Sequence, residues 1–289
     1  MGTSAFSNGP GGGVPFDPPW IDDIGDLQPE DEERPDSDGT GNADGQKDDQ
    51  EEEQTPQCNM EEPKVASPGR FRNSRRELHN FMRTGDRESF GKAIGHYSRT
   101  GMGGARNAAN RMRVSTKSAA NLFGFLQSVR EGVDLSVNEW VAALTSRNAN
   151  PQEIIDEIIN RVAPNDGSLE ETSCVQSMAL AMGDLLEKNP NIDLFHLEDR
   201  NIWSLIESFL AYEAFERLCL DIGQIFESST YSPRDRVIRM NEMQDYLKAE
   251  ISVQVEKFRK VGQNTTSSQL QVILQKALQN TFLVYEGTL

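Results

Sequence analysis

Cysteine and histidine are both scarce in this sequence, with three of each among 289 residues. The cysteines are odd in number and lie far apart, at Cys58, Cys174 and Cys219, which argues against a disulfide scaffold. The histidines fall in different expected elements, none of them in an HExxH motif or near a pair of cysteines. A zinc site therefore lacks its ligands, and we expect no metal.

Long apolar runs are also missing. No stretch approaches the roughly 18 to 20 consecutive apolar residues that a membrane-spanning helix needs, and no apolar signal region follows the first methionine. The sequence therefore predicts a protein without a membrane segment, located in the reducing cytoplasm.

The residue patterns of common enzymes are absent as well. The glycines of GPGGGV and GMGGAR lack the Lys-Ser/Thr pair of a phosphate-binding loop and the pattern of a dinucleotide site. No GxSxG nucleophile motif occurs, and no cysteine has a recognisable basic local setting. We therefore expect a protein that is not an enzyme, with no cofactor and no catalytic residues.

The net charge of −17 is distributed in blocks along the chain. Residues 1–62 hold 18 acidic and two basic residues, whereas residues 64–117 hold 13 basic and three acidic residues. The remainder of the chain is acidic again. The predicted segments are a flexible Gly/Pro/aromatic leader (1–20), an acidic disordered linker (21–68), a basic Gly/Arg-containing helical segment (69–131) and a helical bundle domain (132–289).

The acidic linker has too few branched apolar residues to offset the backbone entropy lost on folding, about 1–2 kcal/mol per residue. Two roles for it stay open. It is either a solvated spacer or an acidic mimic that covers the protein's own basic segment.

From residue 69 onward the sequence has the patterns of helices. Apolar residues recur at three- and four-residue steps, and no alternating strand pattern or Asn-Gly hairpin signal interrupts the series. Helices are predicted over residues 74–85, 87–101, 105–131, 137–144, 151–163, 169–189, 198–227, 233–261 and 267–286. The predicted fold class is all-α, a multi-helix bundle of eight or nine helices preceded by a long flexible glycine/proline-rich and acidic N-terminal tail.

Local signals mark the starts and the faces of these helices. Asn150 before Pro151 combines an N-cap with a first-turn proline, and Ser136 with Glu139 has the spacing of a capping box. The predicted N-caps are Asn73 or Ser74, Asp86, Ser136, Asn150, Ser168, Ser232 and Thr266 or Ser267. Residues 198–227 are apolar on most of their circumference, which predicts a central buried helix. The predicted apolar stripe of 233–261 runs through Val237, Met240, Met243, Leu247, Ile251 and Val255.

The basic segment mixes arginines with the aromatic residues Phe71, Phe81, Phe90 and Tyr97. Guanidinium groups and aromatic faces are what phosphate binding and base stacking require, so one interpretation is contact with nucleic acid, a nucleotide or an acidic partner surface. The other is a set of amphipathic helices whose aromatic side chains are core and whose arginines are solvated or pair with the acidic tail. No recognised nucleic-acid motif decides between them. The candidate contact residues are Arg70, Arg72, Arg75, Arg76, Arg99, Arg106, Arg111 and Arg113.

The leader contains one chemically distinctive group, the α-amine that Gly2 exposes when Met1 is removed. A reference pKa near 7.7–8, against about 10.4 for lysine, leaves much of this amine uncharged and nucleophilic near neutral pH. Phe6 stands where a myristoylation signal has Ser or Thr, which argues against that modification.

The leader MGTSAFSNGPGGGVPFDPPW, the acidic linker, GRFRNSRREL and YSRTGMGGARNAANRM together give the chain a resemblance to a known family. It resembles the QatB proteins of bacterial Qat anti-phage operons, most strongly in the leader and in the glycine-arginine segment. The resemblance implies a non-catalytic component of an antiviral defence complex. Its implied partners are an ATPase, a QueC-like enzyme and a TatD-like nuclease of the same operon.

The resemblance also implies a modification. In that family the QueC-like enzyme activates a 7-deazaguanine carboxylate with ATP and joins it by an amide bond to the N-terminal glycine, which is Gly2 here. Pro-flanked aromatic side chains lose little entropy on binding, so we expect them to anchor the leader on that enzyme. The expected recognition residues are Thr3, Ser4, Phe6, Phe16 and Trp20. The helical domain is expected to mediate partner assembly.

Overall fold

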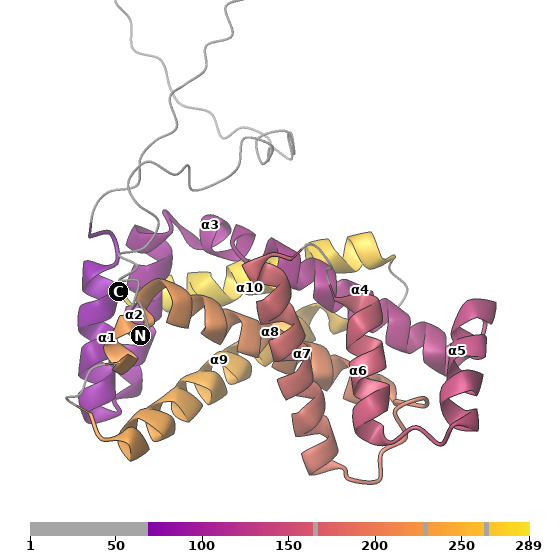
Figure 1. Ribbon diagram of the computed structural model, residues 1–289. Helices are drawn as coiled ribbons and strands as arrows, with labels where there is room; N and C mark the ends of the chain where they lie inside the picture. Colours follow the sequence, from indigo (N-terminus) through magenta and orange to yellow (C-terminus); the bar gives the residue numbers. More distant parts are fainter. Residues whose placement is uncertain (1–68, 164–166, 228–230, 263–265) are drawn as a thin grey trace, which may run out of the picture. The chain divides into compact units, whose positions relative to one another are not determined.

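The computed structural model describes residues 69–163, 167–227, 231–262 and 266–289 (Figure 1). Every regular element in these ranges is a helix, which confirms the predicted all-α fold. The α-helices are α1 (Arg72–Thr84), α2 (Arg87–His96), α3 (Ala105–Asn110), α4 (Arg113–Glu131), α5 (Leu135–Ser146), α6 (Pro151–Val162), α7 (Leu169–Lys188), α8 (Asp199–Ile222), α9 (Pro233–Gly262) and α10 (Ser267–Glu286). A π-helical turn, η2 (Tyr97–Gly101), follows α2, and a 3₁₀ turn, η3 (Gly223–Glu227), follows α8.

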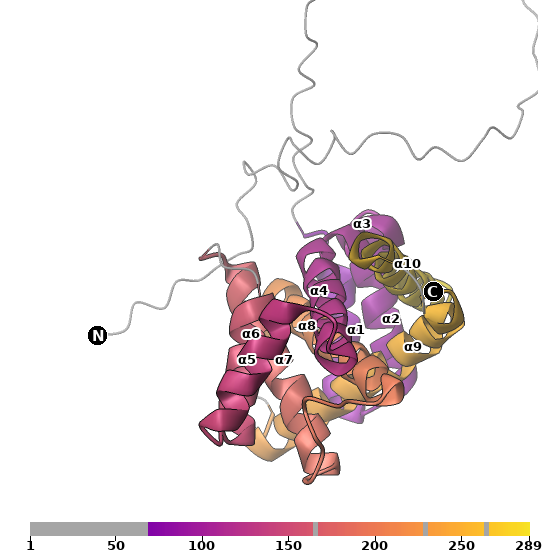
Figure 2. The same cartoon turned by 90° about the vertical axis from the view of Figure 1, so that its right-hand side faces the viewer.

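Helix α8 is the centre of the compact unit formed by residues Gly69–Leu289. It packs against α4, α7 and α9, and buried side chains such as Trp203 and Phe209 occur on most of its circumference, as the sequence predicted. In Figure 2, α4 and α8 lie between a flank made of α5, α6 and α7 and a flank made of α9 and α10. None of the helices in the described ranges has an apolar stretch that could cross a bilayer.

Helix α10 is the second long packing element, and it contacts α2, α3, α4 and α9. Helices α2 and α10 approach closely at Gly95, where a Cβ atom would lie 2.5 Å from the carbonyl oxygen of Tyr285. Only a residue without a side chain fits this crossing. The basic segment and the C-terminal helix therefore share one core.

Most of the predicted capping residues are confirmed. Asn150 and Thr266 each complete a capping box, and the Ser168 side chain accepts a hydrogen bond from the Glu171 amide. Asp86 caps α2 through the amides of Glu88 and Ser89. These signals are local in sequence, so they can be recognised without knowledge of the packing.

Two predicted helix starts are wrong. Helix α5 begins after Asp134, whose carboxylate accepts from the amides of Ser136 and Val137, so Ser136 lies inside the helix. Both residues are good caps, and the carboxylate takes the position because it reaches two amides of the first turn. Helix α1 begins after Phe71, without a side-chain cap, instead of at Asn73 or Ser74. Ser74 is buried and donates from Oγ to the Ala93 carbonyl oxygen at 2.7 Å, so its hydroxyl joins α1 to α2.

The predicted helix over residues 105–131 is divided in two. Helices α3 and α4 meet at Arg111 and Met112, and the Met112 side chain is buried. The turn places the Met112 side chain in the core. The free energy gained by burying it exceeds the preference of this sequence for one continuous helix.

The apolar stripe predicted for α9 is confirmed only in part. Met243, Leu247, Ile251 and Val255 are buried, whereas the Val237 side chain is 58% exposed. Among the described side chains of α9, the first buried one is Met243. The apolar periodicity of the sequence therefore extends further toward the N-terminus of α9 than the buried face does.

Candidate functional site

The glycine-arginine segment changes direction through the π-helical turn η2. Beyond Met102, Gly103 and Gly104 have φ angles of 77° and 115°, which L side chains rarely adopt. Within η2, the Tyr97 hydroxyl donates to Asp221 Oδ2 at 2.8 Å, and Ser98 Oγ donates to Glu286 Oε1 at 2.6 Å. The turn is thereby tied to α8 and α10, and single π turns of this kind often occur at functional sites.

A buried carboxylate lies next to this segment, at Glu213 of α8. Its side chain is fully buried and accepts hydrogen bonds from Ser115 Oγ at 2.5 Å and Ser173 Oγ at 2.7 Å. Arg217 Nη2 lies 3.7 Å from Glu213 Oε2, one helical turn away. The acid is thus held by groups from α4, α7 and α8, as a charge needs to be when it is removed from water.

The network reaches the protein surface through Glu170. Its Oε1 atom lies 3.3 Å from Arg217 Nη1 and 3.0 Å from Arg111 Nη1. Burial alone raises the pKa of Glu170, but hydrogen bonds from its own backbone amide and from Arg111, together with the charges of both arginines, bring that pKa below its ordinary value. The Glu170 carboxylate is therefore the charged link between a buried and a half-buried arginine.

The cysteine in this cluster is not a nucleophile. Burial, and then the charge of Glu213, raise the pKa of the Cys174 thiol to about 12. Burial, and then the charge of Glu216, do the same for Cys219, whose pKa is also about 12. A thiol must ionise to attack, so neither described cysteine is suited to covalent catalysis. No group of His, Cys, Asp and Glu within the described ranges has the arrangement of a metal site.

The candidate arginines fall into two groups. Arg75 Nη2 donates to the backbone oxygen of Asp221 at 3.2 Å, Arg70 lies over the Phe71 ring at 4.7 Å, and Arg111 pairs with Glu170. Arg76 pairs with its neighbour Glu77 at 3.0 Å, and Arg113 is half-buried. Among these candidates, the exposed arginines without a side-chain hydrogen bond or ion pair to any described residue are Arg72, Arg99 and Arg106.

The aromatic side chains of the basic segment are in the core. Phe81 and Phe90 are fully buried with ring centroids 5.3 Å apart, and Phe71 stacks on Tyr97 at 5.6 Å. These rings are not accessible for base stacking. For the aromatics, the structure agrees with the interpretation as amphipathic helices.

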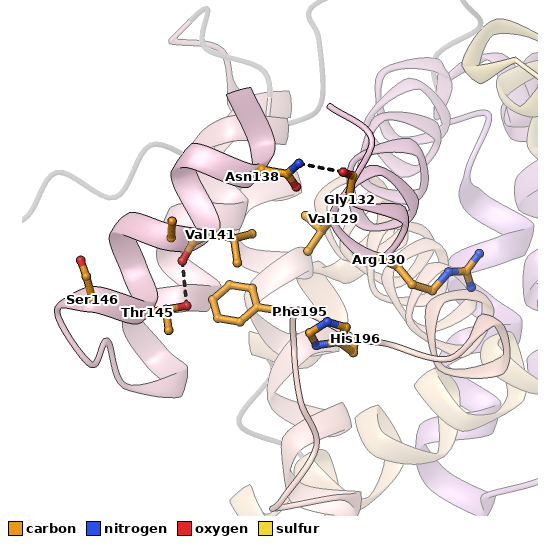
Figure 3. Close-up of a pocket in the computed structure, with 10 residues that line it drawn as sticks. Val129, Arg130, Gly132, Asn138, Val141, Thr145, Ser146, Phe195 and His196 are labelled. Carbon is orange, nitrogen blue, oxygen red and sulfur yellow. Dashed lines mark hydrogen bonds between the residues drawn. The ribbon is translucent and has the colours of Figure 1, made fainter. Parts of the chain in front are cut away.

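A hollow of about 480 Å³ lies between the end of α4, α5 and the loop before α8 (Figure 3). The Phe195 ring extends toward Val141 and Thr145, whereas Arg130 points away from it and pairs with Asp199 at 2.7 Å. Asn138 donates to the Gly132 carbonyl oxygen at 2.7 Å. Since these polar groups are engaged within the protein, the hollow resembles a surface for apolar contact more than a reaction centre.

The proposed modification site cannot be placed in this geometry. Gly2 and the recognition residues Thr3, Ser4, Phe6, Phe16 and Trp20 lie outside the described residues.

Sequence reasoning missed the buried acid and base of α8. Glu213 and Arg217 are separated by four residues in a helix that is otherwise apolar on most sides. An opposite-charge pair at this spacing inside a buried helix is the signal that would have found them.

Comparison with known proteins found one family. Residues 103–285, more than half of the chain, match the family model described as "QatB: Qat anti-phage system associated protein QatB". No curated protein and no solved structure matches the chain.

Proposed function

Since the chain belongs to the QatB family and is therefore a component of an anti-phage Qat system, we propose that it acts there as the acceptor of a modification and not as a catalyst. The observation that carries this proposal is the family match over residues 103–285. The raised pKa values of the Cys174 and Cys219 thiols support a non-catalytic role. Its cytoplasmic location remains a prediction.

The proposed acceptor atom is the α-amine nitrogen of Gly2. A QueC-like enzyme activates the carboxylate of a 7-deazaguanine with ATP, and the uncharged amine attacks the activated acyl carbon. The bond to the activating group breaks, that group leaves with the electron pair, and the nitrogen loses a proton to give a neutral amide. The product mass is that of the two reactants less one water.

Intact-mass spectrometry of the chain coexpressed with its operon tests this step. We expect a fraction of the protein to carry the acyl group on the N-terminal peptide. Gly2→Phe should abolish the adduct, because a bulky second residue keeps Met1 in place, whereas Gly45→Phe makes the same change away from the acceptor and should keep it. An N-terminus that stays free beside an active QueC-like enzyme would refute the proposal.

The proposed role of the helical unit is partner assembly. Val133 and Leu135, at the turn from α4 to α5, are 83% and 73% exposed and directly follow Gly132, which lines the hollow of Figure 3. Large apolar side chains in water next to a hollow favour contact with another protein.

Copurification with the operon's ATPase, QueC-like enzyme and TatD-like nuclease tests this surface. We expect Leu135→Glu to reduce the recovery of at least one partner. Leu169→Glu is the matched control, because Leu169 is also the first residue of a helix and is 76% exposed. Equal recovery with both variants would exclude this surface.

A second candidate function is nucleic-acid binding by the basic segment, supported by the exposed arginines Arg72, Arg99 and Arg106. Without accessible aromatic rings this binding would depend on phosphate contacts, so its affinity should fall steeply as salt rises. Replacing the three arginines by alanine should flatten the dependence of affinity on salt. A flat response in the unaltered chain would exclude this function.

A further inference from the structure

Helices α7, α8 and α9 enclose a second pocket, of about 370 Å³. The middle of α8 contributes Ser208, Ala211 and Tyr212, and the other two helices contribute the remaining lining residues. Those residues are Asp184 and Lys188 of α7 and Asn241, Gln244, Asp245 and Lys248 of α9. Charged groups and amides predominate, so the pocket suits a small polar ligand and not an apolar side chain.

One carboxylate serves two donors within this pocket. Asp184 Oδ2 accepts from the Tyr212 hydroxyl at 2.9 Å and lies 3.4 Å from Lys248 Nζ. A carboxylate oxygen shared in this way neutralises a neighbouring ammonium group less well than a dedicated partner does.

A second ammonium group lies beside the first. Burial and the positive charge of Lys188 lower the pKa of Lys248, and Asp184 opposes this only in part. Lys188 forms no ion pair with any carboxylate in the described part of the chain. The two lysines thus share a single ion-pairing carboxylate, Asp184, which contacts Lys248.

The other acid that lines the pocket, Asp245, forms no ion pair with either lysine in the described part of the chain. Burial, the hydrogen bond to Asp184 and then the charges of Asp184, Asp245 and Glu187 raise the pKa of Tyr212 well above its ordinary value. Among the groups that act most strongly on Lys248, Asp184 is the only acid. The amides of Asn241 and Gln244 make no side-chain hydrogen bond to another described residue, so they are available to a ligand.

We propose that the pocket between α7, α8 and α9 binds a small anionic ligand, with Lys188 and Lys248 holding its carboxylate or phosphate group. Asn241 and Gln244 hydrogen-bond the uncharged part of the same molecule. The volume admits a metabolite-sized ligand and no folded partner. This site is independent of the N-terminal modification and of the surface at Leu135.

Titration of the full chain with inorganic phosphate, and separately with acetate, tests the proposal. Binding is followed by calorimetry or NMR at constant ionic strength with chloride as the background anion. We expect saturable binding of at least one of the two anions, and the preferred one identifies the ligand's anionic group. Lys188→Gln and Lys248→Gln should each weaken it at least about tenfold, because each removes a charge-assisted hydrogen bond.

Lys276→Gln is the matched control, since Lys276 is an exposed lysine of α10 outside the pocket. It should leave the anion affinity unchanged. Lys188 is exposed, so its substitution tests the site even if Lys248→Gln unfolds the chain. Absence of saturable binding of both anions, or equal weakening by Lys188→Gln and Lys276→Gln, would overturn the assignment.

Discussion

The crossing of α2 and α10 allows a paired test of the packing, because two glycines one turn apart on α2 have different surroundings. A Cβ atom at Gly95 would lie 2.5 Å from the Tyr285 carbonyl oxygen and 3.0 Å from Leu289 Cγ. At Gly91 the nearest atom would be Thr288 Oγ1 at 3.6 Å, an ordinary contact. The same substitution therefore meets a clash at one position and ordinary van der Waals contacts at the other.

The backbone at Gly95 has little freedom to relax. The Tyr285 carbonyl oxygen accepts from the Thr288 amide at 3.1 Å and from Thr288 Oγ1 at 2.7 Å, so it is held at the end of α10. Forcing two packed helices apart costs about 1–3 kcal/mol. Replacing glycine by alanine inside a helix returns about 0.8–1.0 kcal/mol.

We therefore expect Gly95→Ala to lower the free energy of unfolding by up to about 2 kcal/mol, the clash less the helix-propensity gain. Gly91→Ala should raise it by about 0.5–1 kcal/mol, because only the propensity changes. Urea unfolding followed by circular dichroism measures both values. A Gly95→Ala variant as stable as Gly91→Ala would refute the close approach of α2 to Tyr285.

Three further expectations concern the buried cluster. Glu213→Ala should lower the free energy of unfolding by about 3–5 kcal/mol, because the buried Arg217 guanidinium then keeps only the partly exposed Glu170 as an acid partner, and Ser115 and Ser173 lose their acceptor; the double variant Glu213→Leu with Arg217→Met should recover most of that loss in the same urea assay. Buried Cys174 and half-buried Cys219, each with a pKa of about 12, should react with iodoacetamide at pH 8 far more slowly in the native than in the denatured chain, and comparable native rates would show that the fold does not protect these thiols. The pKa of Glu170 is lowered below its ordinary value of 4.5, so this carboxylate contributes its full share of stability above pH 4.5 and loses that share as the pH falls through the lowered pKa. Glu170→Gln should therefore make the free energy of unfolding depend less on pH in the acidic range. An unchanged pH dependence would show that the fold does not stabilise the Glu170 carboxylate.

The sequence predicts the helices of this protein well where the signal is local. Asn150 and Thr266 cap their helices as expected because an N-cap depends on a side chain and the next three amides. The division at Met112 was missed because it depends on what surrounds that side chain in the core. For the same reason Val237 fits the apolar pattern of α9 and is nevertheless exposed.

The polar cluster was less predictable than the fold. Tyr97 meets Asp221, Ser98 meets Glu286, and Ser115 meets Glu213 across separations of 124, 188 and 98 residues. Such pairs result from the packing of α4, α8 and α10, and no periodic pattern in the sequence indicates them. The role proposed for Gly2 depends on family resemblance and amine chemistry, which need no tertiary structure.

The acid of α8 also fixes how its neighbours align. If α7 slid along α8 by one turn, Ser173 would leave Glu213 and Glu170 would leave Arg217, so each of two buried charges would lose a partner. An all-hydrophobic contact would tolerate such a slip at little cost, whereas buried ions that lose a hydrogen bond or an ion pair would not. The charged residues therefore select a single alignment of two helices whose apolar surfaces alone would accept more than one.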